Sequence, residues 1–363
     1  MMTTHYTTLH VALPHSPYDI LIGESLLDRF AAMLPPSLSK SRKFFICDSN
    51  TELYARRIAG ESPVFSVSAG EQSKSFSVFQ DVLSWLLDHQ VDRHSLIVAV
   101  GGGVVGDLAG FAAASVMRGV PVVQVPTSLL AMVDSSVGGK TGINMPQGKN
   151  LVGAFHQPSM VICDLEVLKT LPERELKAGY AEILKYALLG DSAFFDWLET
   201  HGQEVLDLNP EAVSYAVKRS CEMKRDIVVA DEKETSGRRA LLNLGHTFAH
   251  AFEAVMGYDG RLLHGEAVAV GMVCAMELSV RKNLMSAQQV ERVVQHLSRL
   301  GLKAHLKDLR LPADVQAETL LEIMRGDKKA AEGSINFILM RGIGQAFLTG
   351  DVAKDDVIQV LTQ

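Results

Sequence analysis

The sequence has no paired cysteines of the kind that build disulfide frameworks or zinc sites. Its four cysteines, Cys47, Cys163, Cys221 and Cys274, lie far apart, and no two of them form a Cys-x-x-Cys motif. Isolated cysteines of this kind are typical of reduced thiols inside a cell. We therefore expect a cytoplasmic protein without disulfides.

An excess of positive charge is also missing. The chain has 35 basic and 42 acidic side chains, a net charge of -7 and a pI near 6.0. This balance removes the electrostatic reason to expect a nucleic acid or an acidic membrane as a partner. Local basic clusters can still bind small phosphates, so a small anionic substrate is compatible with the charge.

Long hydrophobic runs without polar interruption are absent too. The longest apolar stretch, Leu96–Met117, contains Asp107 and five glycines, and its first third has the pattern of a strand. The first 13 residues do not combine a basic start with an apolar core, as a signal peptide would. We expect neither export nor membrane insertion.

The composition that is present describes a globular protein of 363 residues, 47% hydrophobic and 21% charged. Its first half alternates short β-branched runs with helical patterns, which is typical of a parallel α/β sheet. The expected strands are Lys43–Cys47, Val64–Val67, Leu96–Val100, Val122–Val125 and Met160–Cys163.

From about Glu173 onward, apolar residues recur at intervals of three and four, which predicts helices. The expected helical ranges are Ala178–Leu189, Ala212–Val229, Phe248–Met256, Ala267–Val280 and Val290–Leu300. We therefore predict an α/β domain with a parallel sheet over residues 1–172 and a mainly α-helical domain over residues 173–363.

A glycine turn follows one expected strand. Gly101, Gly103 and Gly106 have the spacing of a dinucleotide-binding turn, in which backbone N–H groups approach a pyrophosphate at the start of a helix. However, the ribose-binding carboxylate expected about 20 residues later is replaced by Gln124, and the nearest substitute is Asp48. The segment is therefore either a rearranged nucleotide site or a tight turn that holds no ligand.

A second glycine segment, Ser136–Thr141, resembles the end of a phosphate-binding P-loop. Asp134 stands where that motif needs a glycine, so we do not expect ATP or GTP hydrolysis. Lys140, Lys149 and Asn150 nevertheless place two ammonium groups and an amide on glycine-rich backbone. They can surround an anion, or they can form a solvated loop.

The helical half contains a group of potential metal ligands. His246 and His250 lie four residues apart, so both imidazoles share one face of a helix. His264 begins the next helical stretch, and Glu182 shares a helical face with Lys185. Two histidines and one carboxylate are a common catalytic zinc set. The spacing alone does not decide which histidines bind metal and which one acts as an acid or base.

Basic residues also surround an acidic run in this half. The basic residues are Lys224, Arg225, Arg238 and Arg239, and the run is Asp231, Glu232 and Glu234. A solvated surface explains them as well as an anion-binding clamp does.

These segments together resemble the 3-dehydroquinate synthase family over nearly the whole length. The similarity runs through Gly70–Lys74, Gly101–Asp107, Pro126–Ser128, Val133–Lys140, Gly148–Asn150, Glu182–Tyr186, Leu242–Glu253, His264–Met272 and Asp327–Lys329. The resemblance implies an N-terminal NAD-binding α/β domain, a C-terminal helical domain that binds metal and substrate, and a homodimer.

The resemblance also implies roles for single residues. Glu182, His246 and His264 would bind Zn²⁺ or Co²⁺, and His250 would contact the substrate. NAD would be bound by Asp48, Gly70, Glu71, Gln72, Ser73, Lys74, Gly103, Val104, Val105, Gly106, Asp107, Thr127, Ser128, Lys140, Lys149, Val167, Leu168, Lys169 and Thr170. The substrate's phosphate and carboxylate would be bound by Arg118, Lys140, Asn150, Lys185, Lys224, Arg239, Asn243 and one of Lys328 and Lys329, with Arg118 serving the neighbouring subunit.

The implied reaction converts 3-deoxy-D-arabino-heptulosonate 7-phosphate into 3-dehydroquinate and phosphate, a step of the shikimate pathway to aromatic amino acids. NAD transiently oxidises an alcohol, phosphate leaves by elimination, the hydride returns, and an intramolecular aldol reaction closes the ring. The substrate's own phosphate can accept the proton during elimination, so the site needs cations more than a strong base.

Three alternatives remain open. Another sugar-phosphate cyclase would share the fold and the metal set, although His250, Asn243 and Arg239 favour a substrate with a carboxylate. A metal-dependent polyol dehydrogenase of the glycerol dehydrogenase type would pair similar domains but would not need so many cations. A non-catalytic phosphate-binding protein would leave the metal set unexplained.

Overall fold

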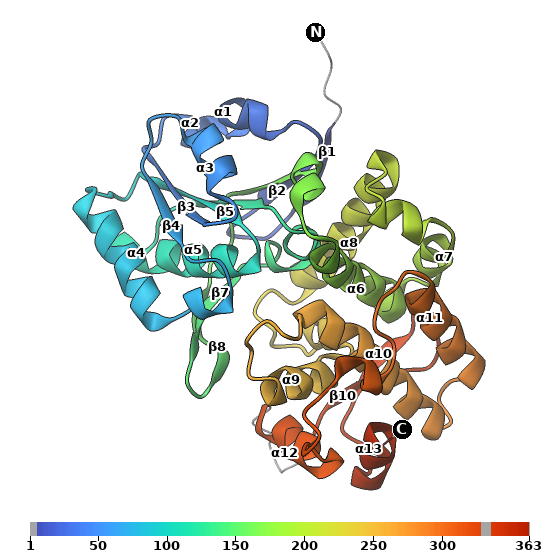
Figure 1. Ribbon diagram of the computed structural model, residues 1–363. Helices are drawn as coiled ribbons and strands as arrows, with labels where there is room; N and C mark the ends of the chain where they lie inside the picture. The colour runs from blue at the N-terminus through green and yellow to red at the C-terminus, as the bar shows by residue number, and fades with distance from the viewer. Residues whose placement is uncertain (1–5, 328–334, 363) are drawn as a thin grey trace. The chain divides into compact units, whose positions relative to one another are not determined.

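The computed structural model describes residues 6–327 and 335–362. The chain forms two compact units, and most of its helices and strands are labelled in Figure 1. One unit takes Met1–Pro172 and Pro210–Lys233, and the other takes Glu173–Asn209 and Glu234–Gln363.

A seven-stranded sheet lies at the centre of the first unit, with the strand order β1-β2-β9-β6-β5-β3-β4. The β1–β2 pair is antiparallel, and all other neighbouring pairs in this sheet are parallel. All five predicted strands are present, and the predicted parallel α/β sheet is confirmed. The strands are β1 (Tyr6–Val11), β2 (Tyr18–Gly23), β3 (Lys43–Asp48), β4 (Val64–Val67), β5 (Leu96–Gly101), β6 (Val122–Pro126) and β9 (Met160–Asp164).

Successive side chains of the central strands point to opposite faces of the sheet, and both faces are covered. Phe44 and Ile46 of β3 join the buried core formed with α4 (Phe76–Asp88) and α5 (Gly103–Ser115). Phe45 packs instead against Phe30, with ring centroids 5.8 Å apart. Burial on both faces explains why the central strands are predominantly apolar, with Gln124 of β6 as a polar exception.

The other elements in the described part of this unit are a hairpin, three short helices, one long helix and several helical turns. A two-stranded hairpin, β7 with β8, stands outside the main sheet. The elements are α1 (Phe30–Met33), α2 (Pro36–Ser39), α3 (Glu52–Ala59), β7 (Lys140–Met145), β8 (Gly148–Phe155) and α8 (Pro210–Ala230), with short helical turns at Leu27–Arg29, Glu71–Ser73, Val116–Arg118, Ala131–Ser135 and Leu165–Thr170.

The second unit is mainly helical, as predicted, with α10 at its centre. This helix is buried along most of its length because α6, α9, α11, α13 and β10 all pack against it. The sequence pattern did not reveal the β10–β11 hairpin. The elements are α6 (Glu173–Gly190), α7 (Ser192–Leu206), α9 (His246–Val255), α10 (His264–Arg281), α11 (Ala287–Arg299), α12 (Ala317–Asp327), β10 (Phe337–Met340), β11 (Ala346–Thr349) and α13 (Lys354–Leu361), with helical turns at Arg239–Asn243 and Leu306–Leu309.

The structure differs from the predicted helical domain of residues 173–363 in one segment. Helix α8 belongs to the first unit, where it packs against β1, β2 and Ala131–Ser135. The apolar period of three and four predicted this helix correctly. That period shows that a helix has a buried face, but it does not identify the surface that buries it.

Two further expectations can be compared with the structure. Among the described helices, none combines the length and hydrophobicity needed to cross a bilayer. All four cysteines are buried and free of disulfides. Burial raises the pKa of Cys47 to about 11 and that of Cys221 to about 12, so both thiols stay protonated.

Candidate active site

The predicted cofactor-binding residues lie where the parallel strands end. Asp48 is the last residue of β3, Gly101 is the last residue of β5, and Thr127 directly follows β6. These three strands are direct neighbours, and the Thr127 N–H donates to the Gly101 carbonyl at 3.0 Å. Residues 70–74 and 165–170 follow β4 and β9 in the same way. The set therefore gathers at the carboxyl edge of the sheet, where open α/β sheets bind ligands.

The glycine turn packs closely against its neighbours. A Cβ atom at Gly103 would lie 3.0 Å from the Ser135 hydroxyl, and one at Gly106 would lie 2.9 Å from the Gln124 side-chain oxygen. Gln124 donates its amide to the Gly106 carbonyl at 3.1 Å, so it fixes α5 against β6. Asp48, the substitute for the ribose-binding carboxylate, accepts hydrogen bonds at this edge from two backbone N–H groups of the following turn.

Lys74 connects two groups of predicted site residues. Its ammonium donates to Asp107 at 2.6 Å and to the Asn150 side chain at 2.5 Å, and the residue is only 4% exposed. Burial raises the pKa of Asp107, and the Lys74 charge opposes that shift. A predicted substrate residue, Asn150, is thus in direct contact with a predicted NAD residue.

Lys224 of α8 is held by a carboxylate that the sequence did not reveal. Its ammonium donates to the Asp134 side chain at 2.8 Å and to the Asp134 carbonyl at 2.6 Å. Asp134 lies in a single π-helical turn, Ala131–Ser135. In the sequence it appeared only as the residue that breaks a P-loop pattern, although a carboxylate among predicted phosphate-binding cations was itself a signal.

Three more predicted residues lie on the first unit at exposed or half-buried positions. Lys140 begins β7, Lys149 lies in β8, and Arg118 follows α5 in a turn where its φ is 63°. A left-handed φ is unusual for arginine and fixes the start of its side chain. Lys328 and Lys329, of which one was predicted to contact substrate, lie outside the described residues.

The predicted metal ligands come together in the second unit. Glu182 lies in the middle of α6, His246 is the first residue of α9, and His264 is the first residue of α10. One potential ligand atom from each lies within 4.8 Å of the other two. The Glu182 Oε1 atom lies 3.7 Å from His246 Nε2 and 3.4 Å from His264 Nε2. Two imidazole nitrogens and one carboxylate oxygen form a donor set that fits Zn²⁺ or Co²⁺.

Two glycines allow the helices to bring these ligands together. Gly245 precedes His246 with a φ of 79°, and a Cβ atom there would lie 2.6 Å from the backbone nitrogen of Met272. Gly265 follows His264, and a Cβ atom there would overlap the backbone of Ala178 in α6. The close contact between α6 and α10 therefore depends on the absence of a side chain at Gly265.

Hydrogen bonds at the other ring nitrogens orient both histidines. His246 Nδ1 lies 3.1 Å from the Leu244 carbonyl, and His264 Nδ1 lies 3.0 Å from Glu253 Oε2. With Nδ1–H as the donor, the Nε2 atom of each ring faces Glu182 and is the atom that would bind a metal ion. This is how histidine ligands of metals are commonly oriented.

The protonation of the two histidines also suits a cation site. Burial lowers the pKa of His246 to about 3, and the Lys185 charge adds to the shift. Burial would also lower the pKa of His264, but Glu253 and Glu182 outweigh it and raise that pKa to about 10. The two carboxylates thus stabilise positive charge at His264, whether a proton or a metal ion carries it.

Four predicted substrate residues belong to the same unit, and two of them lie beside this cluster. Lys185 lies 2.5 Å from Glu182, and both side chains are at most 1% exposed. The His250 ring centroid lies 5.6 Å from that of His246. Arg239, which is 2% exposed, and Asn243 begin and end the short helix that precedes α9.

Sequence reasoning did not single out Asn144 or Glu253. Glu253 lies seven residues after His246 on α9, so it shares the face of the two histidines, and that spacing was a usable signal. Asn144 lies in β7 and contacts residues far away in sequence. No local pattern indicates such contacts.

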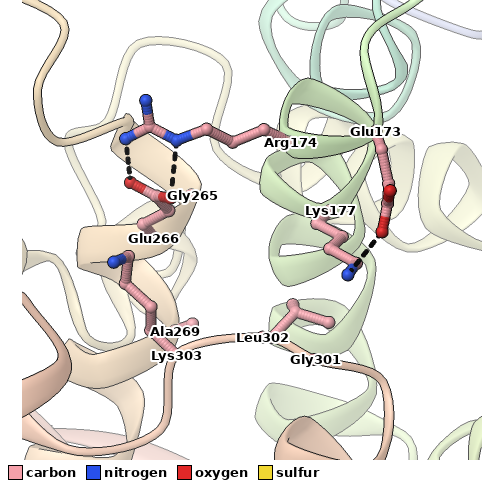
Figure 2. Close-up of a pocket in the computed structure, with 9 residues that line it drawn as sticks. All are labelled: Glu173, Arg174, Lys177, Gly265, Glu266, Ala269, Gly301, Leu302 and Lys303. Atoms are coloured by element: carbon pink, nitrogen blue, oxygen red, sulfur yellow. Dashed lines mark hydrogen bonds and ion pairs between the residues drawn. The ribbon is translucent and has the colours of Figure 1, made fainter.

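A cavity of about 480 Å³ lies beside the first turn of α10, but none of the predicted site residues that the structure describes lines it. Figure 2 shows Arg174 reaching across to Glu266, to which it donates two hydrogen bonds of 2.8 and 2.7 Å. The other two cations are engaged as well, since Lys177 pairs with Glu173 at 2.7 Å and Lys303 donates to the Asp308 carbonyl at 2.9 Å. The Arg174–Glu266 ion pair therefore links α6 to α10 beside the cavity. None of the three proposed metal ligands lines it.

Comparison with known proteins identifies the relatives of this chain. Residues 64–178 match the family model of the 3-dehydroquinate synthase N-terminal region, and residues 179–330 match that of the C-terminal region. The chain is 50% identical to the 3-dehydroquinate synthase of Roseobacter denitrificans, with 98% of this chain and 97% of the relative covered. The 3-dehydroquinate synthase of Ruegeria pomeroyi is also 50% identical, with the same coverage.

Solved structures agree at lower identity. A 2-epi-5-epi-valiolone synthase from Streptomyces hygroscopicus with NAD⁺ and Zn²⁺ bound has a TM-score of 0.85 at 28% identity, with 97% of each chain covered. A 2-deoxy-scyllo-inosose synthase in complex with carbaglucose-6-phosphate, NAD⁺ and Co²⁺ has a TM-score of 0.83 at 27% identity, with 98% of this chain and 99% of that chain covered. A probable glycerol dehydrogenase from Sinorhizobium meliloti, at 18% identity and a TM-score of 0.59, shares the fold alone. Both family models and near full-length relatives at half identity lead to one conclusion: the chain belongs to the 3-dehydroquinate synthase family.

Proposed function

We propose that this protein is a 3-dehydroquinate synthase, a lyase that converts 3-deoxy-D-arabino-heptulosonate 7-phosphate into 3-dehydroquinate and phosphate. The observation that carries the proposal is the cluster of Glu182, His246 and His264 in a chain that is half identical to relatives of that name. The reaction belongs to the shikimate pathway to aromatic amino acids.

The cofactors are NAD and one divalent metal ion, Zn²⁺ or Co²⁺. NAD would be bound at the carboxyl edge of the sheet by Asp48, the Gly103–Asp107 turn, Thr127 and Ser128, with segments 70–74 and 167–170. Lys140 and Lys149 of the β7–β8 hairpin would add to these contacts. Glu182, His246 and His264 would bind the metal. When bound, NAD supplies a hydride acceptor and the metal supplies Lewis acidity.

The cationic residues of the chain position the substrate and stabilise its negative charge. The substrate's phosphate and carboxylate would be bound by Lys140, Asn150, Lys185, Lys224, Arg239, Asn243 and one of Lys328 and Lys329. His250 would contact the substrate as well, and Arg118 would act in the neighbouring subunit. Fixed cations of this kind favour the departure of phosphate without a strong protein base.

One experiment tests the reaction directly. Protein loaded with metal is supplied with NAD and the heptulosonate phosphate, and phosphate release is followed together with nicotinamide absorbance. Stoichiometric phosphate without accumulation of NADH is expected, because the hydride returns within each cycle, and 3-dehydroquinate is expected as the product. Steady NADH accumulation with polyols and no phosphate release would contradict the proposal.

A second candidate function is another sugar-phosphate cyclase, since the solved cyclases named above are similar over nearly the whole chain. Arg239, Asn243 and His250 favour a substrate that carries a carboxylate. Supplying sedoheptulose 7-phosphate and glucose 6-phosphate in the same assay separates the two candidates. Phosphate release from either sugar at the rate found with the heptulosonate phosphate would favour the second candidate.

We further propose a cytoplasmic homodimer. Four buried, unpaired thiols support a reducing compartment. The predicted role of Arg118 in a neighbouring subunit supports the dimer, because its side chain starts from an exposed turn. Sedimentation at micromolar concentration is expected to give twice the mass of 39.5 kDa, and a monomer would contradict this proposal.

A further inference from the structure

Asn144 interrupts the pairing of the β7–β8 hairpin. The two strands are in register from Lys140 opposite Phe155 to Ile143 opposite Val152, and the register then shifts before Met145. At this irregularity the Asn144 N–H leaves the hairpin and donates to the Lys74 carbonyl at 2.7 Å. Irregularities of this kind redirect a side chain and are frequent beside active sites.

The Asn144 side chain uses both ends of its amide. The nitrogen donates to the Glu71 carboxylate at 2.7 Å, and the oxygen accepts from the Asn150 N–H at 3.0 Å. Asn150 has a φ of 54°, a left-handed conformation that its hydrogen-bonded N–H helps to hold. One residue therefore joins the segment after β4 to both strands of the hairpin.

These contacts determine where the Lys74 ammonium lies. Asn144 binds the main chain of Lys74 and the main chain of Asn150, and the side chains of those two residues meet at 2.5 Å. The same ammonium lies 2.6 Å from Asp107. The Lys74 side chain is nearly buried, so it has little room to move. A small displacement of the hairpin would therefore change the distance between the Lys74 ammonium and the Asn150 side chain.

We propose that Asn144 is a positioning residue that locks segment 71–74 to the β7–β8 hairpin and so holds Lys74 between Asp107 and Asn150. The inference rests on the proposed function, in which Glu71, Lys74 and Asp107 bind NAD and Asn150 binds substrate. It predicts that one side chain outside both sets controls the affinity for both ligands.

The amide is the group that these contacts require. Alanine would remove both side-chain hydrogen bonds. Aspartate would keep the acceptor for the Asn150 N–H but would place a second carboxylate against Glu71, where like charges repel. Changing Glu71 to glutamine supplies a donor to that aspartate, so the hydrogen bond is restored with its direction reversed.

The test measures the NAD dissociation constant by calorimetry and the KM and kcat for the heptulosonate phosphate by phosphate release. Asn144→Ala is expected to raise the NAD dissociation constant about tenfold and to lower kcat/KM at least as much, the scale of one lost charge-assisted hydrogen bond. Gln147→Ala, at an exposed position in the tip of the same hairpin, is the matched control and should change neither value by more than about twofold.

A double-mutant cycle separates positioning from general packing. Asn144→Asp should weaken NAD binding about tenfold in the natural background and less than about twofold in the Glu71→Gln background, because the contact is restored there. Equal losses in both backgrounds, or an Asn144→Ala variant that binds NAD as the natural protein does, would overturn the inference. Natural protein that neither binds NAD nor releases phosphate would overturn the proposed function instead, so the two failures are distinguishable.

Discussion

Glu253 Oε2 lies 3.0 Å from His264 Nδ1, on the side of the imidazole ring opposite to Glu182. Both carboxylates are almost completely buried, at 4% and 0% side-chain exposure. Glu253 fixes the orientation of the His264 ring. Glu182 would bind the same metal ion as that ring.

Replacing Glu253 is therefore expected to weaken metal binding without removing a ligand. Glu253→Gln keeps a hydrogen-bond acceptor but loses the charge, so the metal dissociation constant should rise roughly 10- to 100-fold, the usual effect of losing such a partner. Competition with a chromophoric chelator measures this constant. Glu204→Gln, which removes the carboxylate of an exposed His201–Glu204 pair, is the control and should leave it unchanged.

Replacing a proposed ligand should have a larger effect. His264→Ala removes one of three donors, so the variant should lose both metal retention after dialysis and phosphate release. Atomic absorption and the phosphate assay check the two results. A variant with full activity and full metal content would show that His264 is not a ligand.

The contact between α6 and α10 predicts a strong effect at Gly265. A methyl group there would overlap the backbone of Ala178, which cannot rotate away, so Gly265→Ala should destabilise the fold by roughly 1–3 kcal/mol. Because α6 carries Glu182 and α10 carries His264, metal affinity should fall as well. Urea unfolding measures the first effect.

A control glycine lies on α12 of the same unit. Nothing lies within 4 Å of a Cβ atom at Gly326, so Gly326→Ala should leave the fold equally stable or more stable, by up to about 1 kcal/mol. Equal destabilisation by both substitutions would contradict the role assigned to Gly265.

Acid should destabilise the protein partly through His296. Its ring is 3% exposed and lies 2.9 Å from the Tyr180 hydroxyl, and burial, with a smaller contribution from Arg299, lowers its pKa to about 4. Above pH 6.5 the ring is neutral in both the folded and the unfolded chain, so it contributes no pH dependence. Between pH 6.5 and pH 4 only the unfolded chain takes up the proton, and stability falls by up to roughly 3 kcal/mol.

Urea unfolding at several pH values tests this expectation. His296→Gln should lose less stability than the natural protein between pH 6.5 and pH 4. Tyr180→Phe keeps the imidazole and should be less stable at every pH while it retains the pH dependence. Identical pH dependence in His296→Gln and the natural protein would contradict the assignment.

Short-range patterns in the sequence predicted the fold class and the candidate metal ligands, whereas the choice of Glu182, His246 and His264 among those candidates came from the family resemblance. Strands such as Leu96–Val100 are apolar along their length, and His246 shares a helix with His250. The contacts of Asp134 with Lys224 and of Asn144 with Glu71 join residues 90 and 73 positions apart. Periodicity contains no information about such distant pairs, so only the three-dimensional structure revealed them.

The membership of α8 in the first unit has a consequence for biosynthesis. The polypeptide crosses from one unit to the other three times, after residues 172, 209 and 233. The surface of β1 and β2 therefore remains without its covering helix until residue 230 has been synthesised. Although its sheet strands are complete by residue 164, the N-terminal unit cannot finish folding before α7 has also been translated.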